Sequence, residues 1–343
     1  MKKFLLVFAA LFLTFGAVAC GGANDDFQVG LVTDTGGIDD KSFNQGTWEG
    51  ILRFAEDYDL PEDNRRYLQS SSDADYIPNI SAFADEQLDL IVMPGFLFED
   101  ALKNASENYP EQNFLIIDSV VEADNVASAV FAEPEGSFLV GVAAALKAQD
   151  ASEDTVGFIG GGDFPLIHGF EAGYVAGVHA VDPDMTVLVD YVGDFTSNDK
   201  GQALAVKQFD NGAYVIYHAA GGAGNGAISE AKSRRTNGED VWVIGVDKDQ
   251  YEEGIYNDDD DSAILTSMVK RVDVAAYEVA EDTLNDEFPG GQVLIFDLEN
   301  NGVGLPDDNP NLSAEILSTV SDYRDDIIAG DITVPTVPER LNE

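Results

Sequence analysis

Residues 27–58 read FQVGLVTDTGGIDDKSFNQGTWEGILRFAEDY, and they contain the first sign of the fold class. Its first part, 27–34, is a short apolar run rich in β-forming residues. A loop rich in Gly and Asp follows, and residues 45–58 then carry apolar side chains at helical spacing. A strand that leads through a loop into an amphipathic helix is the unit from which parallel α/β sheets are built.

The same alternation continues along the whole chain. Further strand-like runs lie at 88–94, 114–118, 126–131, 156–159, 186–192, 214–217, 241–246 and 263–268, and helical patterns lie at 135–147, 165–181, 200–211, 271–285 and 312–328. The 343 residues suffice for about two domains of ordinary size. The pattern therefore predicts an α/β protein of two lobes, each a doubly wound, mostly parallel sheet flanked by helices.

The charge balance excludes some classes of partner. There are 18 Lys and Arg against 64 Asp and Glu, a formal net charge of -46, so nucleic acid and anionic membrane surfaces would repel the chain. Such an excess of acids destabilises a compact state unless salt screens it, and the Debye length falls from about 10 Å at 0.1 M to about 3 Å at 1 M. We therefore expect a high-salt habitat.

The amino terminus carries a secretion signal. Lys2 and Lys3 precede an apolar run over 4–18, and small residues at 17–19 precede Cys20, the only cysteine. This resembles a bacterial lipoprotein signal, so we expect cleavage after residue 19, a lipid on Cys20 and a tether over 20–26; an uncleaved anchor is the alternative. Either way the rest of the chain is expected outside the cytoplasm, at the cell membrane, on its periplasmic or outer face.

Metal sites lack support in the sequence. One cysteine permits neither an intramolecular disulfide nor a cysteine cluster, and His168, His179 and His218 lack zinc-site spacing. The acidic run 258–261 lacks the alternating ligands and the Gly of a calcium loop. We expect no metal, no cofactor and no catalytic residue.

Polar and aromatic residues gather just past the predicted strands, where doubly wound sheets bind ligands. These strand ends carry Asp34, Gly95 and Phe96, Asp118, Phe195, Gly222 and Asp247. Aromatic rings can stack on a flat ligand, and carboxylates accept hydrogen bonds from hydroxyl or N–H donors.

Longer motifs carry a family resemblance. They are residues 30–34 (GLVTD), 37–45 (GIDDKSFNQ), 48–50 (WEG), 95–98 (GFLF), 125–128 (NVAS), 135–144 (EGSFLVGVAA), 157–161 (GFIGG), 170–174 (FEAGY), 221–226 (GGAGNG) and 244–247 (IGVD). Together they resemble the basic membrane lipoprotein family (BMP, PnrA-like), whose members are purine nucleoside receptors of ABC importers. The resemblance spans nearly all of residues 27–340.

The resemblance implies a type I periplasmic-binding-protein fold that closes on a nucleoside such as guanosine, adenosine or inosine. Phe43 and Phe195 match the two rings that sandwich the purine, and Asp34 and Asn44 match positions beside the base. Four further positions match the surroundings of the ribose: Asp118, Gly222, Asp247 and Lys270. Gly95 and Phe96 are added to the cleft by their place after a strand.

The implied partners are an ABC permease and its ATPase, and the protein is expected to be a monomer that touches the membrane only through its lipid. We expect lobe 1 to comprise 27–132 plus 247–288 and lobe 2 to comprise 133–246 plus 289–343. The chain would then cross between the lobes three times, near residues 131, 246 and 290.

Several alternatives remain open. A sugar- or signal-molecule-binding lipoprotein of the same fold would also use aromatic rings, Asp and Asn. Residues 34–40 superficially resemble the calcium-binding aspartates of nucleoside hydrolases, although Asp34 precedes Asp39 by five residues rather than four. For single residues, Phe43 could pack against the helix that follows it, Asp247 could cap a helix, and Lys270 could lie on the surface.

Overall fold

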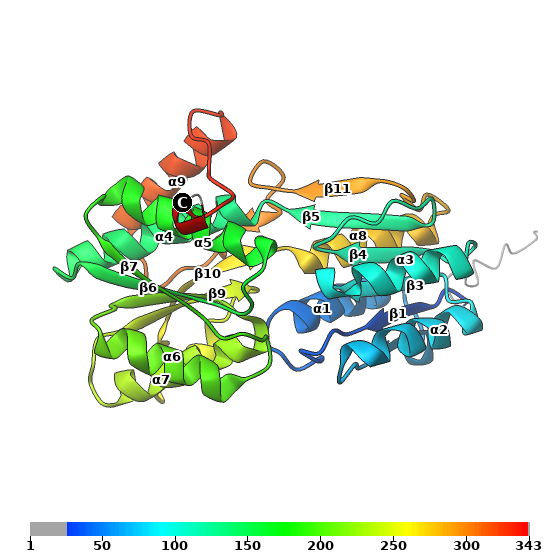
Figure 1. Ribbon diagram of the computed structural model, residues 1–343, viewed down its shortest axis with the longest axis horizontal. Coiled ribbons are helices and arrows are strands. Elements are labelled where there is room, and N and C mark those ends of the chain that lie inside the picture. Colours follow the sequence, from blue (N-terminus) through cyan, green and yellow to red (C-terminus); the bar gives the residue numbers. More distant parts are fainter. Residues whose placement is uncertain (1–25, 342–343) are drawn as a thin grey trace, which may run out of the picture.

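The computed structural model describes residues 26–341, which form two six-stranded sheets, each flanked by helices (Figure 1). The strand order is β11-β5-β4-β3-β1-β2 in the first sheet and β12-β10-β9-β8-β6-β7 in the second. Every pairing is parallel except that of β10 with β12. The predicted fold class is confirmed.

The first lobe consists of the first sheet and the helices packed on its two faces. Its strands are β1 (Val29–Val32), β2 (Arg65–Leu68), β3 (Leu90–Pro94), β4 (Phe114–Ile117), β5 (Val126–Phe131) and β11 (Val293–Phe296), and its helices are α1 (Phe43–Asp57), α2 (Tyr76–Glu86), α3 (Glu99–Asn108) and α8 (Val272–Leu284). Alternate residues of β3 enter different clusters: Leu90 and Val92 join the core beneath α1 and α8, whereas Ile91 and Met93 join that beneath α2 and α3. This two-residue period fits a strand covered on both faces.

The second lobe is built in the same way. Its strands are β6 (Thr155–Gly160), β7 (Thr186–Tyr191), β8 (Val215–Ala219), β9 (Trp242–Asp247), β10 (Ile264–Lys270) and β12 (Val303–Gly304), and its helices are α4 (Glu133–Asp150), α5 (Pro165–Val181), α6 (Asn198–Asp210), α7 (Asn225–Thr236) and α9 (Ala314–Ile328). Helices α4 and α5 pack so closely that a Cβ on Gly177 would lie 2.0 Å from the carbonyl oxygen of Phe138. Glycine at this position allows the close approach that places the start of α5 beside the cleft.

The chain crosses between the lobes at Ala132, at Arg271 and over residues 297–302. This differs from the expected lobe boundaries, which assigned 247–288 to lobe 1 and 289–343 to lobe 2. Strand β10 belongs to the second sheet because it pairs with β9 from Ile264 to Val269, and β11 belongs to the first sheet because it pairs with β5. The second and third crossings therefore follow these strands instead of preceding them.

Six elements were not anticipated from the sequence: β2, β11, β12, α2, α3 and α7. Strand β2 reads RRYL and so lacks the apolar pattern of a buried strand. Strand β11 reads VLIF, a short apolar run that was overlooked, and as an edge strand it leaves Val293 and Ile295 exposed. Helix α2 contains Pro78, and α7 is polar along most of its length. Their apolar contacts with the sheets stabilise them despite these weak local signals.

Among residues 26–341, no helix combines the length and the apolar character needed to cross a membrane. The predicted signal peptide, Cys20 and most of the tether lie outside the described residues.

Candidate ligand-binding site

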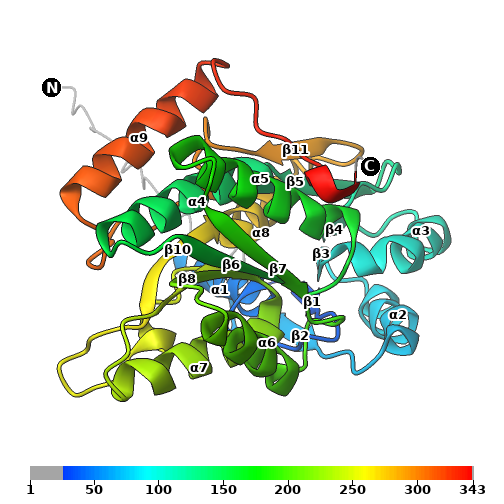
Figure 2. The ribbon, with the colours of Figure 1, turned by 60° about the vertical axis from the view of Figure 1, so that its left-hand side comes forward.

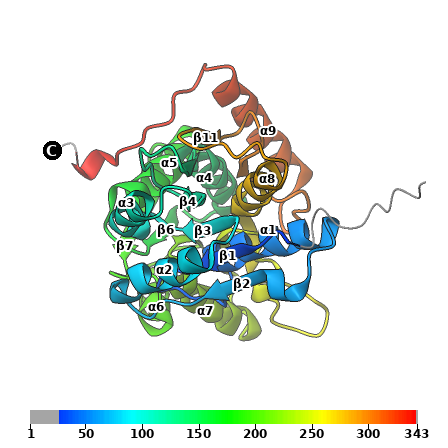
Figure 3. The ribbon, with the colours of Figure 1, turned by 90° about the vertical axis from the view of Figure 1, so that its right-hand side faces the viewer.

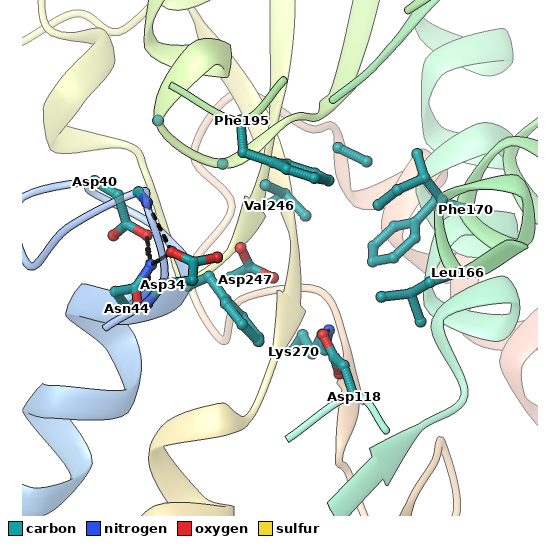
Figure 4. Close-up of a pocket in the computed structure, with 16 residues that line it drawn as sticks. Asp34, Asp40, Asn44, Asp118, Leu166, Phe170, Phe195, Val246, Asp247 and Lys270 are labelled. Carbon is teal, nitrogen blue, oxygen red and sulfur yellow. Dashed lines mark hydrogen bonds and ion pairs between the residues drawn. The ribbon is translucent and has the colours of Figure 1, made fainter. Parts of the chain in front are cut away.

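A pocket lies between the two lobes, where the carboxyl ends of strands from both sheets meet (Figure 4). About 540 Å³ of space not filled by atoms lies in it, part of which is open to solvent. Its lining comprises Asp34, Gly36, Asp40, Phe43, Asn44, Asp118, Leu166, Ile167, Phe170, Phe195, Ala219, Gly221, Gly222, Val246, Asp247 and Lys270. The structure therefore brings eight of the ten predicted site residues together around one pocket.

The other two predicted residues, Gly95 and Phe96, lie just outside this lining. A Cβ on Gly95 would lie 3.6 Å from Oδ2 of Asp34 and from Cε1 of Phe43, so the glycine backs the pocket wall. The ring of Phe96 lies across the cleft from the second lobe, with its centroid 5.3 Å from that of Phe164 and 6.4 Å from that of Phe195.

One wall is a hydrogen-bonded loop that leads from β1 into α1. Nδ2 of Asn44 donates to Oδ1 of Asp34 over 2.7 Å and to Oδ2 of Asp40 over 2.9 Å (Figure 4). Asp40 also accepts from the backbone N–H groups of Ser42, Asn44 and Gln45, and so holds the first turn of α1 in place. The loop thus fixes two polar side chains, Asp34 and Asn44, at the pocket.

Asp34 is held as an acceptor in a buried position. Its Oδ1 accepts the hydrogen bonds from Asn44 and from the N–H of Gly36, whereas no donor within residues 26–341 forms a hydrogen bond with Oδ2. Burial raises the pKa of Asp34 to about 6, and the bonds from Asn44 and Gly36 oppose this rise. Above that pH the carboxylate can accept an N–H donor from a ligand.

Aromatic side chains enter the pocket from both lobes. Phe43 is the first residue of α1 in the first lobe, while Phe195 lies in the loop between β7 and α6 and Phe170 lies on α5 in the second. A Cβ on Gly161 would lie 2.3 Å from the ring of Phe195, so the ring fits only because glycine is there. The rings can stack on the faces of a flat ligand that enters the cleft.

The floor of the pocket is a buried charge cluster around Lys270. The Lys270 side chain is 2% exposed, and its Nζ lies 2.5 Å from Oδ2 of Asp118 and 3.4 Å from Oε1 of Glu133. Asp247 also attracts this ammonium, and its Oδ2 accepts a hydrogen bond from the hydroxyl of Ser42. Three carboxyl groups therefore surround one ammonium, and Asp118 and Ser42 come from the lobe opposite Lys270.

The pKa values in this cluster follow from burial and mutual attraction. Burial raises the pKa of all three carboxyl groups: that of Asp247 rises to about 6, that of Glu133 rises to about 8, and that of Asp118 also lies above its usual value. The positive charge of Lys270 opposes each of these rises. Burial alone would lower the pKa of Lys270, but the surrounding acids outweigh it and raise that pKa above its usual value. The ammonium therefore stays charged, and Glu133 carries its proton at neutral pH.

Such a floor can bind hydroxyl groups. A carboxylate accepts from one or two neighbouring hydroxyls, and an ammonium donates to a hydroxyl or ether oxygen. Within residues 26–341 no group of three or more His, Cys, Asp or Glu side chains is arranged to hold a metal ion.

The two lobes also touch around the pocket. Nδ2 of Asn225 donates to the carbonyl of Asp40 over 2.9 Å, Nε2 of Gln250 donates to the carbonyl of Lys41 over 2.9 Å, and Nζ of Lys248 lies 2.7 Å from Oε1 of Glu49. The structure therefore has the cleft closed.

Sequence reasoning missed several residues of the site, including Asp40, Ser42, Leu166, Phe170 and Glu133. Phe170 stood in the family motif 170–174, and Glu133 was visible only as part of an acidic helix start. The structure also bears on the alternatives considered for Phe43 and Lys270. Phe43 lines the pocket, and Lys270 is buried rather than on the surface.

The chain is similar to known proteins in both sequence and fold. The family model for "ABC transporter substrate-binding protein PnrA-like" matches residues 27–337. A Listeria innocua protein named "CD4+ T-cell-stimulating antigen" is 41% identical over 98% of this chain and 100% of its own length. The "ABC transporter nucleoside-binding protein BmpA" of Lactococcus lactis is 38% identical over 98% of this chain and 100% of its own length.

Among solved structures, a solute-binding protein of an ABC transporter system from Aeropyrum pernix K1 superimposes with a TM-score of 0.80. It is 27% identical, and the match covers 91% of this chain and 94% of that one.

Proposed function

Because the chain belongs to the family of PnrA-like ABC transporter substrate-binding proteins, we propose that it captures a purine nucleoside in the interlobe pocket and delivers it to an ABC permease. The protein changes no bond of its ligand. In this proposal it acts as a monomer outside the cytoplasm, held at the cell membrane by a lipid on Cys20.

One observation carries the proposal: Phe43 and Phe195, from opposite lobes, line the same pocket as a buried carboxylate and lysine floor. A purine between the two rings would gain stacking energy, which is worth about 1–3 kcal/mol per base in nucleic-acid binders. Asp34 and Asn44 would then meet the polar edge of the base. The ribose hydroxyls would meet Asp118, Asp247 and Lys270.

The mechanism is closure of the lobes about the three crossings. An open cleft would separate Phe43 and Asp118 from Phe195, Asp247 and Lys270, because the two sets lie on different lobes. A nucleoside that contacts both sets binds the closed form more tightly and shifts the population toward it. The permease would then recognise the closed lobes.

Isothermal titration calorimetry tests this proposal. Residues 24–343, which contain the whole described fold, would be titrated in molar NaCl with guanosine, adenosine, inosine, ribose and galactose. We expect micromolar or tighter binding of purine ribosides and no binding of the two sugars. Binding of sugars alone would contradict the proposal in favour of a carbohydrate receptor, and release of free base from inosine with calcium would favour a hydrolase.

A further inference from the structure

The segment that follows α9, residues 329–341, lies along the outside of the second lobe, and we call it the C-terminal strap. Figures 2 and 3 show it, in red, leaving α9 and running across the molecule. Ile332 and Val334 pack against the main hydrophobic core, and the strap ends in a 3₁₀ helix, Glu339–Leu341. Apolar contacts at these two residues thus hold the first half of the strap, whereas Val337 and Leu341 are exposed.

Its end is fixed by an ion pair with a buried acid. Nε and Nη2 of Arg340 donate to the two carboxylate oxygens of Glu171, each over 2.8 Å. The Glu171 side chain is 3% exposed, whereas that of Arg340 is 39% exposed. A bidentate Arg–carboxylate pair fixes both distance and orientation, so Arg340 adds a directional tie to this part of α5 beside its packing on α4.

Tyr191, the last residue of β7, completes the network. Its hydroxyl donates to Glu171 and accepts a hydrogen bond from Nη2 of Arg340 over 3.1 Å, and the guanidinium carbon lies 5.2 Å from the centre of its ring. Asp163 is a second acid near Arg340, with its Oδ1 3.7 Å from Nη2 of the arginine. Arg340 therefore ties α5 to the end of β7.

These two elements carry the aromatic wall of the pocket in the second lobe. Phe170 precedes Glu171 on α5, and Phe195 follows Tyr191 by four residues. Tyr191 and Phe195 pack on consecutive glycines of the β6 end: a Cβ on Gly160 would lie 2.5 Å from Cε1 of Tyr191, and one on Gly161 would lie 2.3 Å from the ring of Phe195. A shift of Tyr191 would therefore be transmitted to the ring that faces the ligand.

We propose that Arg340 is a positioning residue of the ligand site, which holds Phe170 and Phe195 in place by clamping α5 to β7. This inference rests on the proposed function, because it assigns the strap a role in the same pocket. Without the guanidinium, Glu171 is a buried carboxylate that has lost its cation, and α5 shifts to hydrate it. The two rings then lose their fixed spacing from Phe43, and stacking weakens.

The test measures the dissociation constant of guanosine for matched variants. Arg340→Ala should weaken binding roughly three- to tenfold, which is less than complete loss of a stacking ring would cause. Tyr191→Phe, which removes one hydroxyl of the network, should weaken it in the same direction by a smaller factor. Arg66→Ala is the control: Arg66 is about as exposed as Arg340 but pairs with an exposed acid, Glu86, on the first lobe outside the pocket lining, so its loss should leave affinity unchanged.

A double variant separates positioning from general loss of stability. If Arg340 acts through the aromatic wall, Arg340→Ala should cost little further affinity in a Phe195→Ala background. The proposal would be overturned if the double variant lost affinity by the product of the two single factors. It would also be overturned if Arg340→Ala and Tyr191→Phe both bound guanosine with wild-type affinity, whatever their melting temperatures. A wild-type protein that binds no purine nucleoside would instead contradict the proposed function itself.

Discussion

Asp118 follows strand β4 of the first sheet and Asp247 ends β9 of the second, yet both have left-handed backbone conformations, with φ of 68° and 66°, and both interact with the ammonium of Lys270. Residues other than glycine rarely adopt this conformation, and strained residues cluster at functional sites. Asp118 comes from the first lobe, and Asp247 and Lys270 from the second. Closing the cleft therefore brings Asp118 to the ammonium and completes the charged floor.

Asp247→Asn tests the role of this floor in ribose binding. Loss of the charge should weaken purine ribosides by roughly 1–3 kcal/mol, because hydrogen bonds to charged groups contribute about that much. Free purine bases, which lack the ribose, should bind as they do to the wild type. Calorimetry with guanosine and guanine measures both affinities, and an equal loss for both ligands would argue against this role.

Phe195→Ala tests stacking. The ring is only partly buried even with the cleft closed, so its removal should leave the melting temperature of the unliganded protein almost unchanged. Nucleoside affinity should fall by roughly 1–3 kcal/mol. Tyr67→Ala removes a 41% exposed ring far from the pocket lining and serves as the control for binding. If the unliganded Phe195→Ala protein were strongly destabilised, Phe195 would be a core residue instead.

Glu133→Gln tests the charge cluster through the pH dependence of stability. The pKa of Glu133 is raised to about 8 in the folded protein from an ordinary value of 4.5, mainly by burial. The proton on Glu133 therefore stabilises the fold fully below pH 4.5, and this contribution is lost as the pH rises through 8. Glutamine mimics the protonated acid, so the variant should melt several degrees above the wild type at pH 9 and close to it at pH 5.

Circular dichroism melts at pH 5, 7 and 9 give this comparison. Glu62→Gln, at an exposed position on the first lobe, controls for the simple loss of one negative charge. A constant difference between Glu133→Gln and the wild type across this range would contradict a buried, proton-binding Glu133.

The net charge of -46 leads to a prediction about salt. Between 0.1 M and 2 M NaCl the melting temperature should rise markedly, since screening weakens the repulsion among surface acids. Potassium chloride should act like sodium chloride, because screening does not depend on the identity of the cation. A melting temperature that stays flat over this range would remove the argument for a high-salt habitat.

The site residues that could be predicted from the sequence are those that lie at or just after the ends of strands. Asp34, Asp118, Phe195 and Asp247 could be located from the sequence because ligand residues of doubly wound sheets follow buried strands, and buried strands are apolar runs. Lys270 was assigned by family resemblance, since one lysine after a strand has many possible roles.

Residues that depend on long-range packing could not be found in this way. Glu133 reads as an ordinary helix start, and it meets Lys270 only because two crossings of the chain lie side by side. Arg340 is separated from Glu171 by 169 residues, and no local pattern links them. The lobe boundaries failed for the same reason, since β10 and β11 reveal their sheets only through their partners.

A crystal structure of the protein with guanosine would show directly whether the interlobe pocket binds a purine nucleoside. We expect the purine ring between Phe43 and Phe195, with the ribose hydroxyls within hydrogen-bond distance of Asp118, Asp247 or Lys270. A nucleoside bound outside this pocket, or inside it with the ribose between the two rings and the base on the charged floor, would refute the proposed function of these residues.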